Sequence, residues 1–436
     1  MMYDYLRRFG DVARIAVRLR LSLGSVRRYQ ERRLRRVVED ACRYVPFYRR
    51  LFREAGLSPG DIRGLDDLPR VPMTSKKALK LAPPETWFDL RFDPARLIAF
   101  RTTGSTGIPF IIRRSAAEDF LFHCFRLRSL RSYGVRMRDR VMRARNGNLG
   151  HRPLSWRLVQ AASLFRQSVL DTSETPQQNA ADLLRTRPDV LTGYNSTLAK
   201  LARIITLDHQ TTVPLRMAVG GADMLTPLLR RQIQEAFQAR IHDTYECQEI
   251  GFLAWECPDT GLYHVCDDNL IIEVLKDGRP AREGEPGEVV ATSLHLRSMP
   301  FLRYQLEDIV TVGPSPCPCG LPFRTFRSIE GKKQDYFRLP GGDELYPWAI
   351  SLVVIDDAPW VQQFEIVQER LDRVVLRAEA RPEPTSEVTE RLAARIRPLL
   401  GPGVEFVIEV VPEIRPTPGG KFWTRRSLVN TMYEPE

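Results

Sequence analysis

The sequence predicts an α/β protein with a large N-terminal domain of mixed sheets and helices and a small α+β C-terminal domain. Two short apolar runs, at residues 190–192 and 215–219, are each followed by Gly or polar residues and then by a helical pattern, the order typical of parallel α/β organisation. Beyond Leu270 the apolar runs are separated by short polar turns, as in antiparallel hairpins. The last part of the chain, residues 332–436, combines strand, helix and strand patterns.

Size and composition agree with this class. A chain of 436 residues, 43% of them hydrophobic, is large enough for two or three domains at roughly 150 residues each. No run approaches the ~18 apolar residues of a membrane helix, and the N-terminus lacks the apolar segment of a secretory signal. Seven thinly spread cysteines fit thiols in a reducing compartment. We therefore expect a cytoplasmic protein without a membrane span.

The net charge of +11 raises the question of an anionic partner. Only eight of the 65 basic residues are lysine, and the arginines are spread along the whole chain, with the densest stretch at residues 18–36. That stretch is typical of a solvated helix face, and a nucleic-acid or anionic-surface binder is the alternative. Because no stretch interleaves basic and aromatic residues, we expect no nucleic-acid partner. A polyanionic small molecule such as a nucleotide also suits the charge.

The expected elements follow in chain order. Residues 1–56 read as helical, with apolar residues at helical spacing up to Pro46, which closes the run. Thr74 or Ser75 caps a short helix at 76–81. Further helices are expected at 119–133, 181–187, 196–208 and 225–240, a hairpin at 270–275 and 287–292, and C-terminal elements at 361–368, 373–378, 386–400 and 404–411. We predict an N-terminal domain at 1–330, a hinge at 331–335 and a C-terminal domain at 336–436.

The first chemical signal is a loop of small and hydroxyl residues after the apolar stretch 97–100. Its members are Thr102, Thr103, Gly104, Ser105, Thr106 and Gly107. Such a loop lets backbone N–H groups approach phosphate oxygens, and its hydroxyls add donors without bulk. It lacks the Gly-Lys-Ser/Thr ending of a Walker loop. Taken alone, the pattern also fits an ordinary turn.

Four further segments follow in a fixed order, at 244–249, 299–308, 329–335 and 415–421. Together with the loop they resemble the adenylate-forming superfamily, and most closely the phenylacetate-CoA ligases and their CapK-like relatives. Segments 45–48 and 317–320 also resemble segments of those ligases. The resemblance covers essentially the whole chain, and five ordered motifs are jointly specific although each alone is weak.

The resemblance implies a two-step reaction. ATP and a carboxylate give an acyl-adenylate and pyrophosphate, and coenzyme A or another nucleophile then displaces AMP. In this reading Glu249 holds Mg²⁺, Asp308 accepts from the ribose hydroxyls and Tyr245 stacks near adenine. The implied ATP-binding set is the 102–107 loop with Gly221, Ala222, Tyr245, Gln248, Asp308 and Lys332. Outside such motifs, isolated carboxylates are more often solvated surface groups.

The strongest catalytic candidates are Lys421 and Glu249. Lys421 follows Thr417-Pro418-Gly419-Gly420, a turn that lets a side chain swing inward, in a chain that rarely uses lysine. The resemblance implies that this ammonium contacts the carboxylate and the α-phosphate during adenylation. The alternative is a solvated loop lysine.

Several positions depart from the family pattern. Glu246 and Gln248 stand where the family usually has Gly and Ser or Thr, Glu307 replaces a usual Gly, Lys332 a usual Arg, and Gln334 a frequent Asp. These departures leave open a second reading, a catalytically weakened scaffold of the same fold that binds a nucleotide or an acyl ligand.

A second constellation is formed by Cys257, His264, Cys317 and Cys319. Three thiolates and an imidazole are the four soft ligands of a closed tetrahedral zinc site, and we predict structural zinc that fastens the region 257–319. Free buried thiols are the alternative.

The acyl pocket is expected near the helix that carries Phe120, Phe122, His123 and Phe125, and near segments 194–196 and 220–223. The aromatic residues would suit an aryl or medium-length acid, although core packing explains them equally well. The identity of the acid, the acceptor and the oligomeric state, a homodimer included, stay open.

Overall fold

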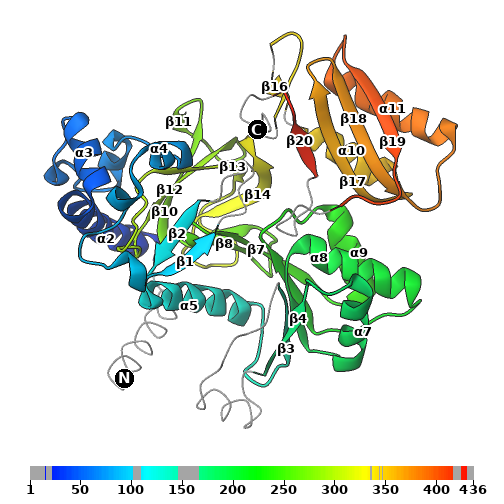
Figure 1. The fold of residues 1–436 in the computed structure, drawn as a ribbon, viewed down its shortest axis with the longest axis horizontal. Helices are drawn as coiled ribbons and strands as arrows, with labels where there is room; N and C mark the ends of the chain where they lie inside the picture. Colours follow the sequence, from blue (N-terminus) through cyan, green and yellow to red (C-terminus); the bar gives the residue numbers. More distant parts are fainter. Residues whose placement is uncertain are drawn as a thin grey trace.

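The computed structural model describes residue 15 and residues 22–101, 110–145, 166–333, 336–342, 344–345, 347–415 and 424–429. The predicted α/β class is confirmed: a twelve-stranded mixed sheet dominates the chain, and a four-stranded sheet follows near the C-terminus (Figure 1). Among the described residues no helix is both long and apolar enough to cross a membrane.

One half of the large sheet is parallel, as the alternating pattern predicted. Its strands lie in the order β4 (Gln167–Asp171), β3 (Val141–Arg145), β5 (Val190–Thr192), β6 (Met217–Gly221) and β7 (Ile241–Cys247). The helices of this half are α7 (Pro176–Thr186), α8 (Asn195–Arg203) with a π turn at Ile204–Asp208, and α9 (Pro227–Phe237). Leu198 and Ile233 share one apolar cluster with Leu191 of β5, so burial of one helix face positions α8 and α9 on the sheet.

The other half of the sheet is antiparallel. From β7 its order is β8 (Gly251–Glu256), β9 (Tyr263–Val265), β14 (Thr325–Lys332), β13 (Tyr304–Val312), β12 (Pro286–Ser293), β10 (Leu270–Lys276) and β11 (Arg279–Pro280). The expected hairpin is the β10–β12 pair, in which Leu270 lies opposite Ser293. At the end of β14, Lys332 pairs with Asp308 of β13.

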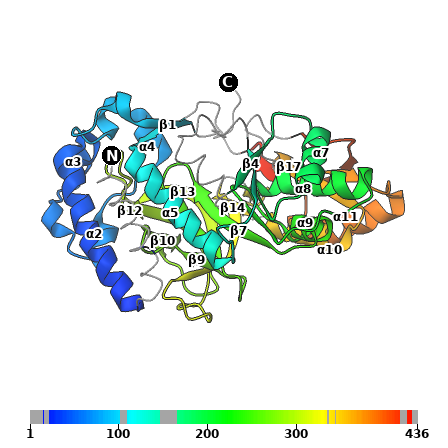
Figure 2. The ribbon, with the colours of Figure 1, turned by 90° about the horizontal axis from the view of Figure 1, so that it is seen from below.

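Helices from the N-terminal part of the chain lie beside the antiparallel half of the sheet (Figure 2). They are α2 (Leu23–Tyr44), α3 (Pro46–Glu54), α4 (Lys76–Leu81) and α5 (Ala116–Ser132), with short turns at Pro59–Asp61, Leu65–Arg70, Pro84–Trp87 and Pro94–Arg96 and a ribbon of β1 (Ile98–Arg101) and β2 (Ile111–Arg114). Pro46 ends the first helical run as expected, and it also opens α3 at a position where its missing N–H costs nothing. Ser75 is the cap of α4, since its side chain accepts from the N–H of Ala78.

The C-terminal part has its own sheet and apolar core. The strand order is β19 (Glu405–Val410), β18 (Arg373–Ala380), β17 (Val361–Arg370) and β20 (Arg425–Ser427), accompanied by α10 (Trp348–Asp357), α11 (Ser386–Leu400) and the small ribbon of β15 (Phe337–Arg338) and β16 (Glu344–Leu345). Its core includes Phe364, Leu376 and Ile396, and Leu228 of α9 joins the same cluster. This part therefore packs against α9 of the large domain (Figure 1).

Candidate active site

Three of the predicted nucleotide-binding residues meet at the junction of β7, β13 and β14. The Tyr245 hydroxyl donates to Oδ2 of Asp308 at 2.5 Å, and Nζ of Lys332 lies 2.7 Å from Oδ1 of the same carboxylate. The ammonium of Lys332 also donates to the carbonyl of Leu306 at 2.9 Å. Burial alone would lower the pKa of Lys332, but Asp308 and Glu249 raise it above its usual value. The lysine is therefore a permanent cation at neutral pH.

Glu249 lies in the turn after β7, half-buried and electrostatically coupled to Lys332. A second cation faces this carboxylate, Lys76 at the start of α4, and the sequence analysis missed it. Burial lowers the pKa of Lys76, whereas Glu249 opposes that shift. The only local signal was the cap of a short helix, which does not reveal what the first residue of that helix faces. Gln248, next to Glu249, is exposed.

The backbone next to Asp308 has the conformation that suits the glycine of the family pattern, although this chain has Glu307 there. Glu307 has a φ of 60°, in the left-handed region that favours glycine. A glycine at this position, as the family usually has, would carry no steric penalty. Ala222, at the end of β6, also has a positive φ, 68°.

The ends of β6 and β7 approach each other closely around Gly221. A Cβ on Gly221 would lie 2.4 Å from Oγ1 of Thr244, so no larger residue fits there without rearrangement. The next carboxylate, Asp223, caps α8 by accepting from the N–H of Asn195 at 2.7 Å and of Ser196 at 3.2 Å. Gly221 and Ala222 thus lie in a tightly packed corner at the carboxyl ends of the parallel strands, where ligands bind in α/β sheets.

Several predicted residues lie outside the described part of the chain. These are the loop residues Thr102, Thr103, Gly104, Ser105, Thr106 and Gly107, the hinge residues Gln334 and Asp335, and Lys421. Their roles stay predictions.

The four predicted zinc ligands come together. Cys257 follows β8, His264 lies in β9, and Cys317 and Cys319 lie in the loop between β13 and β14; one ligand atom from each falls within 4.8 Å of all the others. Nε2 of His264 is 3.3 Å from Sγ of Cys319. Burial and Arg128 lower the pKa of His264 to about 4, so the imidazole is neutral at pH 7, the form in which it binds metal.

The phenylalanines of α5 lie in the main core or against it. Phe122 and Phe125 are buried in the main core, and Phe120 packs against the same core. The exposed side chain of His123 lies 3.5 Å from Asp119 on the same helix. Core packing, one of the two interpretations left open, accounts for Phe122 and Phe125, whereas a role of the partly buried Phe120 in an acyl pocket stays a prediction.

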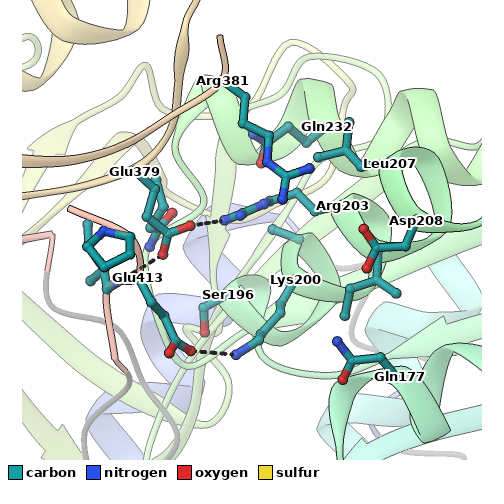
Figure 3. Close-up of a pocket in the computed structure, with 15 residues that line it drawn as sticks. Gln177, Ser196, Lys200, Arg203, Leu207, Asp208, Gln232, Glu379, Arg381 and Glu413 are labelled. Carbon is teal, nitrogen blue, oxygen red and sulfur yellow. Dashed lines mark hydrogen bonds and ion pairs between the residues drawn. The ribbon is translucent and has the colours of Figure 1, made fainter. Parts of the chain in front are cut away.

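A cavity of about 360 Å³ lies between α8, one side of α9 and the C-terminal part of the chain (Figure 3). Two ion pairs cross it: Arg203 with Glu379 at 2.7 Å, and Lys200 with Glu413 at 3.6 Å. The side chain of Glu379 is 9% exposed and also accepts from the N–H of Ile414 at 2.6 Å. These polar contacts around the cavity add to the apolar contact of Leu228 in holding the C-terminal part against α8 and α9.

Comparisons with known proteins agree with this geometry. No protein-family model matches the chain. The chain is 30% identical over 368 residues to the phenylacetate-coenzyme A ligase of Thermus thermophilus, and the match covers 81% of each chain.

Solved structures share the fold. A 2-hydroxyisobutyryl-CoA ligase in the post-adenylation state gives a TM-score of 0.79 at 21% identity, over 95% of this chain and 91% of that chain. The same ligase in the thioesterification state gives 0.63, over 94% and 91%. With 30% identity across 81% of its length, the chain belongs to the phenylacetate-coenzyme A ligase family of AMP-forming carboxylate ligases.

Proposed function

We propose that this chain converts an aromatic carboxylic acid and ATP to an acyl-adenylate and pyrophosphate, and then transfers the acyl group to coenzyme A. The observation that carries the proposal is the contact of Tyr245 and Lys332 with Asp308, beside Glu249, in a chain of this family. The Thermus thermophilus relative, which is named for phenylacetate, supports an aromatic acid. An amine or hydroxyl acceptor, which the CapK-like resemblance suggests, is the other outcome of the test.

The reaction must bring a carboxylate to a highly anionic triphosphate, so charge has to be neutralised and the groups held in line. Asp308, oriented by Tyr245 and Lys332, would accept from the ribose hydroxyls. Lys76 and Lys332 place two ammonium groups beside Glu249, where they would attract phosphate oxygens. Glu249 would hold Mg²⁺, which supplies charge neutralisation at the phosphates.

The loop 102–107 and Lys421 complete the proposed site. The loop would hold the phosphates through its N–H and hydroxyl groups. Lys421 would contact the carboxylate of the acid and the α-phosphate while they react, because a compact ammonium can follow charge that moves between two oxygens.

A weakened scaffold remains the second candidate, favoured by Glu246 and Gln248. Two observations speak against the scaffold. Glu307 has the left-handed backbone that a glycine would adopt, and the neighbouring Asp308 contacts both Tyr245 and Lys332. Pyrophosphate release that needs both ATP and an acid separates the two candidates: an enzyme shows it, whereas a scaffold binds ATP without it.

We also propose that residues 336–436 form a lid that turns about the segment 331–335. Lys421 must leave the adenylate before an acceptor can reach it, so the two half-reactions need two lid orientations. The higher TM-score with the post-adenylation state, 0.79 against 0.63, supports the view that the present orientation is the one for adenylation. The pairs Arg203–Glu379 and Lys200–Glu413 would stabilise it.

Structural zinc is a further part of the proposal. A tetrahedral zinc site with Zn–N of about 2.0–2.1 Å and Zn–S of about 2.3 Å places a nitrogen and a sulfur ligand about 3.5 Å apart. Nε2 of His264 and Sγ of Cys319 are 3.3 Å apart, and the four ligand atoms lie within 4.8 Å of one another. Nδ1 of His264 is buried without a hydrogen-bond partner in the described structure. Zinc would tie β8, β9 and the loop before β14 together and would take no part in catalysis. The seven cysteines form no disulfide among the described residues, which suits the cytoplasmic location that we propose.

A further inference from the structure

An ion pair joins Arg126 of α5 to Glu246 of β7, the position where the family usually has Gly. Nε of Arg126 donates to Oε1 of Glu246 at 3.0 Å, and Nη2 donates to Oε2. The two side chains are 35% and 20% exposed, so water or a small ligand can still reach them. The carboxylate of Glu246 raises the pKa of Arg126, so the guanidinium stays charged at neutral pH.

The pair lies at the ends of the parallel strands. Oγ1 of Thr244 is 3.4 Å from Oε1 of Glu246 and donates to the carbonyl of Gly220 at 2.8 Å. Tyr194, just after β5, is close enough to Arg126 for the guanidinium to lower its pKa, although burial raises that pKa overall. The ends of β5, β6 and β7 and the face of α5 therefore surround one polar region next to the proposed adenylate site.

Arg126 has hydrogen-bonding capacity left over. A guanidinium carries five N–H donors, and within the described residues only Nε and Nη2 have an acceptor, the carboxylate of Glu246. Because Glu246 balances the charge, the remaining donors suit a neutral acceptor better than a second anion. The carboxylate can in turn accept from an O–H or N–H group. A hydroxyl or amino substituent satisfies both partners.

An apolar group is a poor neighbour for this pair. Covering the pair with a hydrocarbon would remove water from donors that have no protein acceptor, and buried unpaired polar groups cost free energy. The large apolar side chains of α5 do not offset that cost, because Phe122 and Phe125 are committed to the core.

We propose that Arg126 and Glu246 select acids that carry a hydroxyl or amino group on the acyl part, over the unsubstituted acids of the same shape. The proposal rests on the proposed carboxylate-activating function. It assigns to the departure at position 246 a role in substrate choice rather than a loss of activity.

The test compares acids that differ by one hydroxyl: phenylacetate with its 2-, 3- and 4-hydroxy derivatives, and butanoate with 3-hydroxybutanoate. Pyrophosphate release gives kcat and KM for each. We expect at least one hydroxylated acid to exceed its parent about tenfold or more in kcat/KM, mainly through KM. Equal kcat/KM within every pair would overturn the selection proposal, whereas pyrophosphate release with none of these acids would count against the proposed function itself.

Variants then assign the preference to the pair. Arg126→Met/Glu246→Met removes both charges together and leaves no buried charge unpaired, and we expect it to lose or invert the preference. The conservative control Glu246→Gln keeps an acceptor and should retain part of it. If the double variant fails to fold by circular dichroism, Glu246→Gln and Glu246→Leu are compared instead. A preference that is unchanged in the folded variants contradicts the assignment.

Discussion

Replacing Glu307 by glycine should stabilise the protein. The residue has a φ of 60°, and a side chain in that region costs about 1–2 kcal/mol, whereas glycine adopts it freely. Glycine also has more conformational freedom in the unfolded chain, and this lowers the free energy of the unfolded state by roughly 0.5–1 kcal/mol. Glu307→Ala keeps the strained backbone but removes the carboxylate, so it is the matched control. We expect Glu307→Gly to be more stable than Glu307→Ala by about 1 kcal/mol.

Urea unfolding followed by tryptophan fluorescence measures the difference, with wild type and both variants under one buffer. The comparison of glycine with alanine isolates the backbone, because neither variant carries the charge. If Glu307→Ala proves as stable as Glu307→Gly, the left-handed conformation at position 307 is not strained, and backbone strain gives no reason to prefer glycine there. Pyrophosphate release by the same variants shows separately whether the carboxylate contributes to activity.

Four further expectations concern the metal, the lysine, the lid and pH. Purified protein should contain about one zinc per chain, and Cys317→Ser should lose zinc and unfold at lower urea; metal-free protein with wild-type stability would refute this. Lys421→Ala should reduce adenylation about 100-fold or more through kcat while ATP binding stays, and an unchanged rate would remove the lysine from the mechanism. Arg203→Met should slow pyrophosphate release about threefold relative to thioester formation, with a smaller effect from Lys200→Met, whose pair is longer; equal slowing of both half-reactions would contradict the lid. Burial and neighbouring arginines lower the pKa of His242 from 6.5 to about 4, so the folded state binds fewer protons at this residue and its contribution to stability falls as pH drops below 6.5. Between pH 7 and 5 the wild type should therefore lose about 2 kcal/mol more stability than His242→Gln, and an equal loss in both proteins would contradict this assignment.

Local patterns accounted for much of the fold. The expected helix at 386–400 has the observed bounds of α11, and Ser75 caps α4, because periodicity and caps depend on neighbouring residues. The alternation of strands and helices also predicted the parallel half of the large sheet correctly. Short-range signals of this kind suffice to place elements.

Contacts between distant segments could not be read in the same way. Arg126 and Glu246 are 120 positions apart in the sequence. The parallel pairing of β20 with β17 likewise joins segments that are distant in the sequence. Lys76 carried no motif, and its position beside Glu249 depends on how α4 packs. The cluster of Cys257, His264, Cys317 and Cys319 was the exception, because the residue types themselves limit the possible partners.

The exchange of labelled pyrophosphate into ATP tests the central claim most directly. The account predicts exchange that requires a carboxylic acid and Mg²⁺, followed by AMP release and acyl-CoA formation when coenzyme A is added. Aryl acids with and without a hydroxyl group are the first to be tested. Binding of ATP without exchange, across aryl and medium-length acids, would contradict the enzyme and leave the nucleotide-binding scaffold.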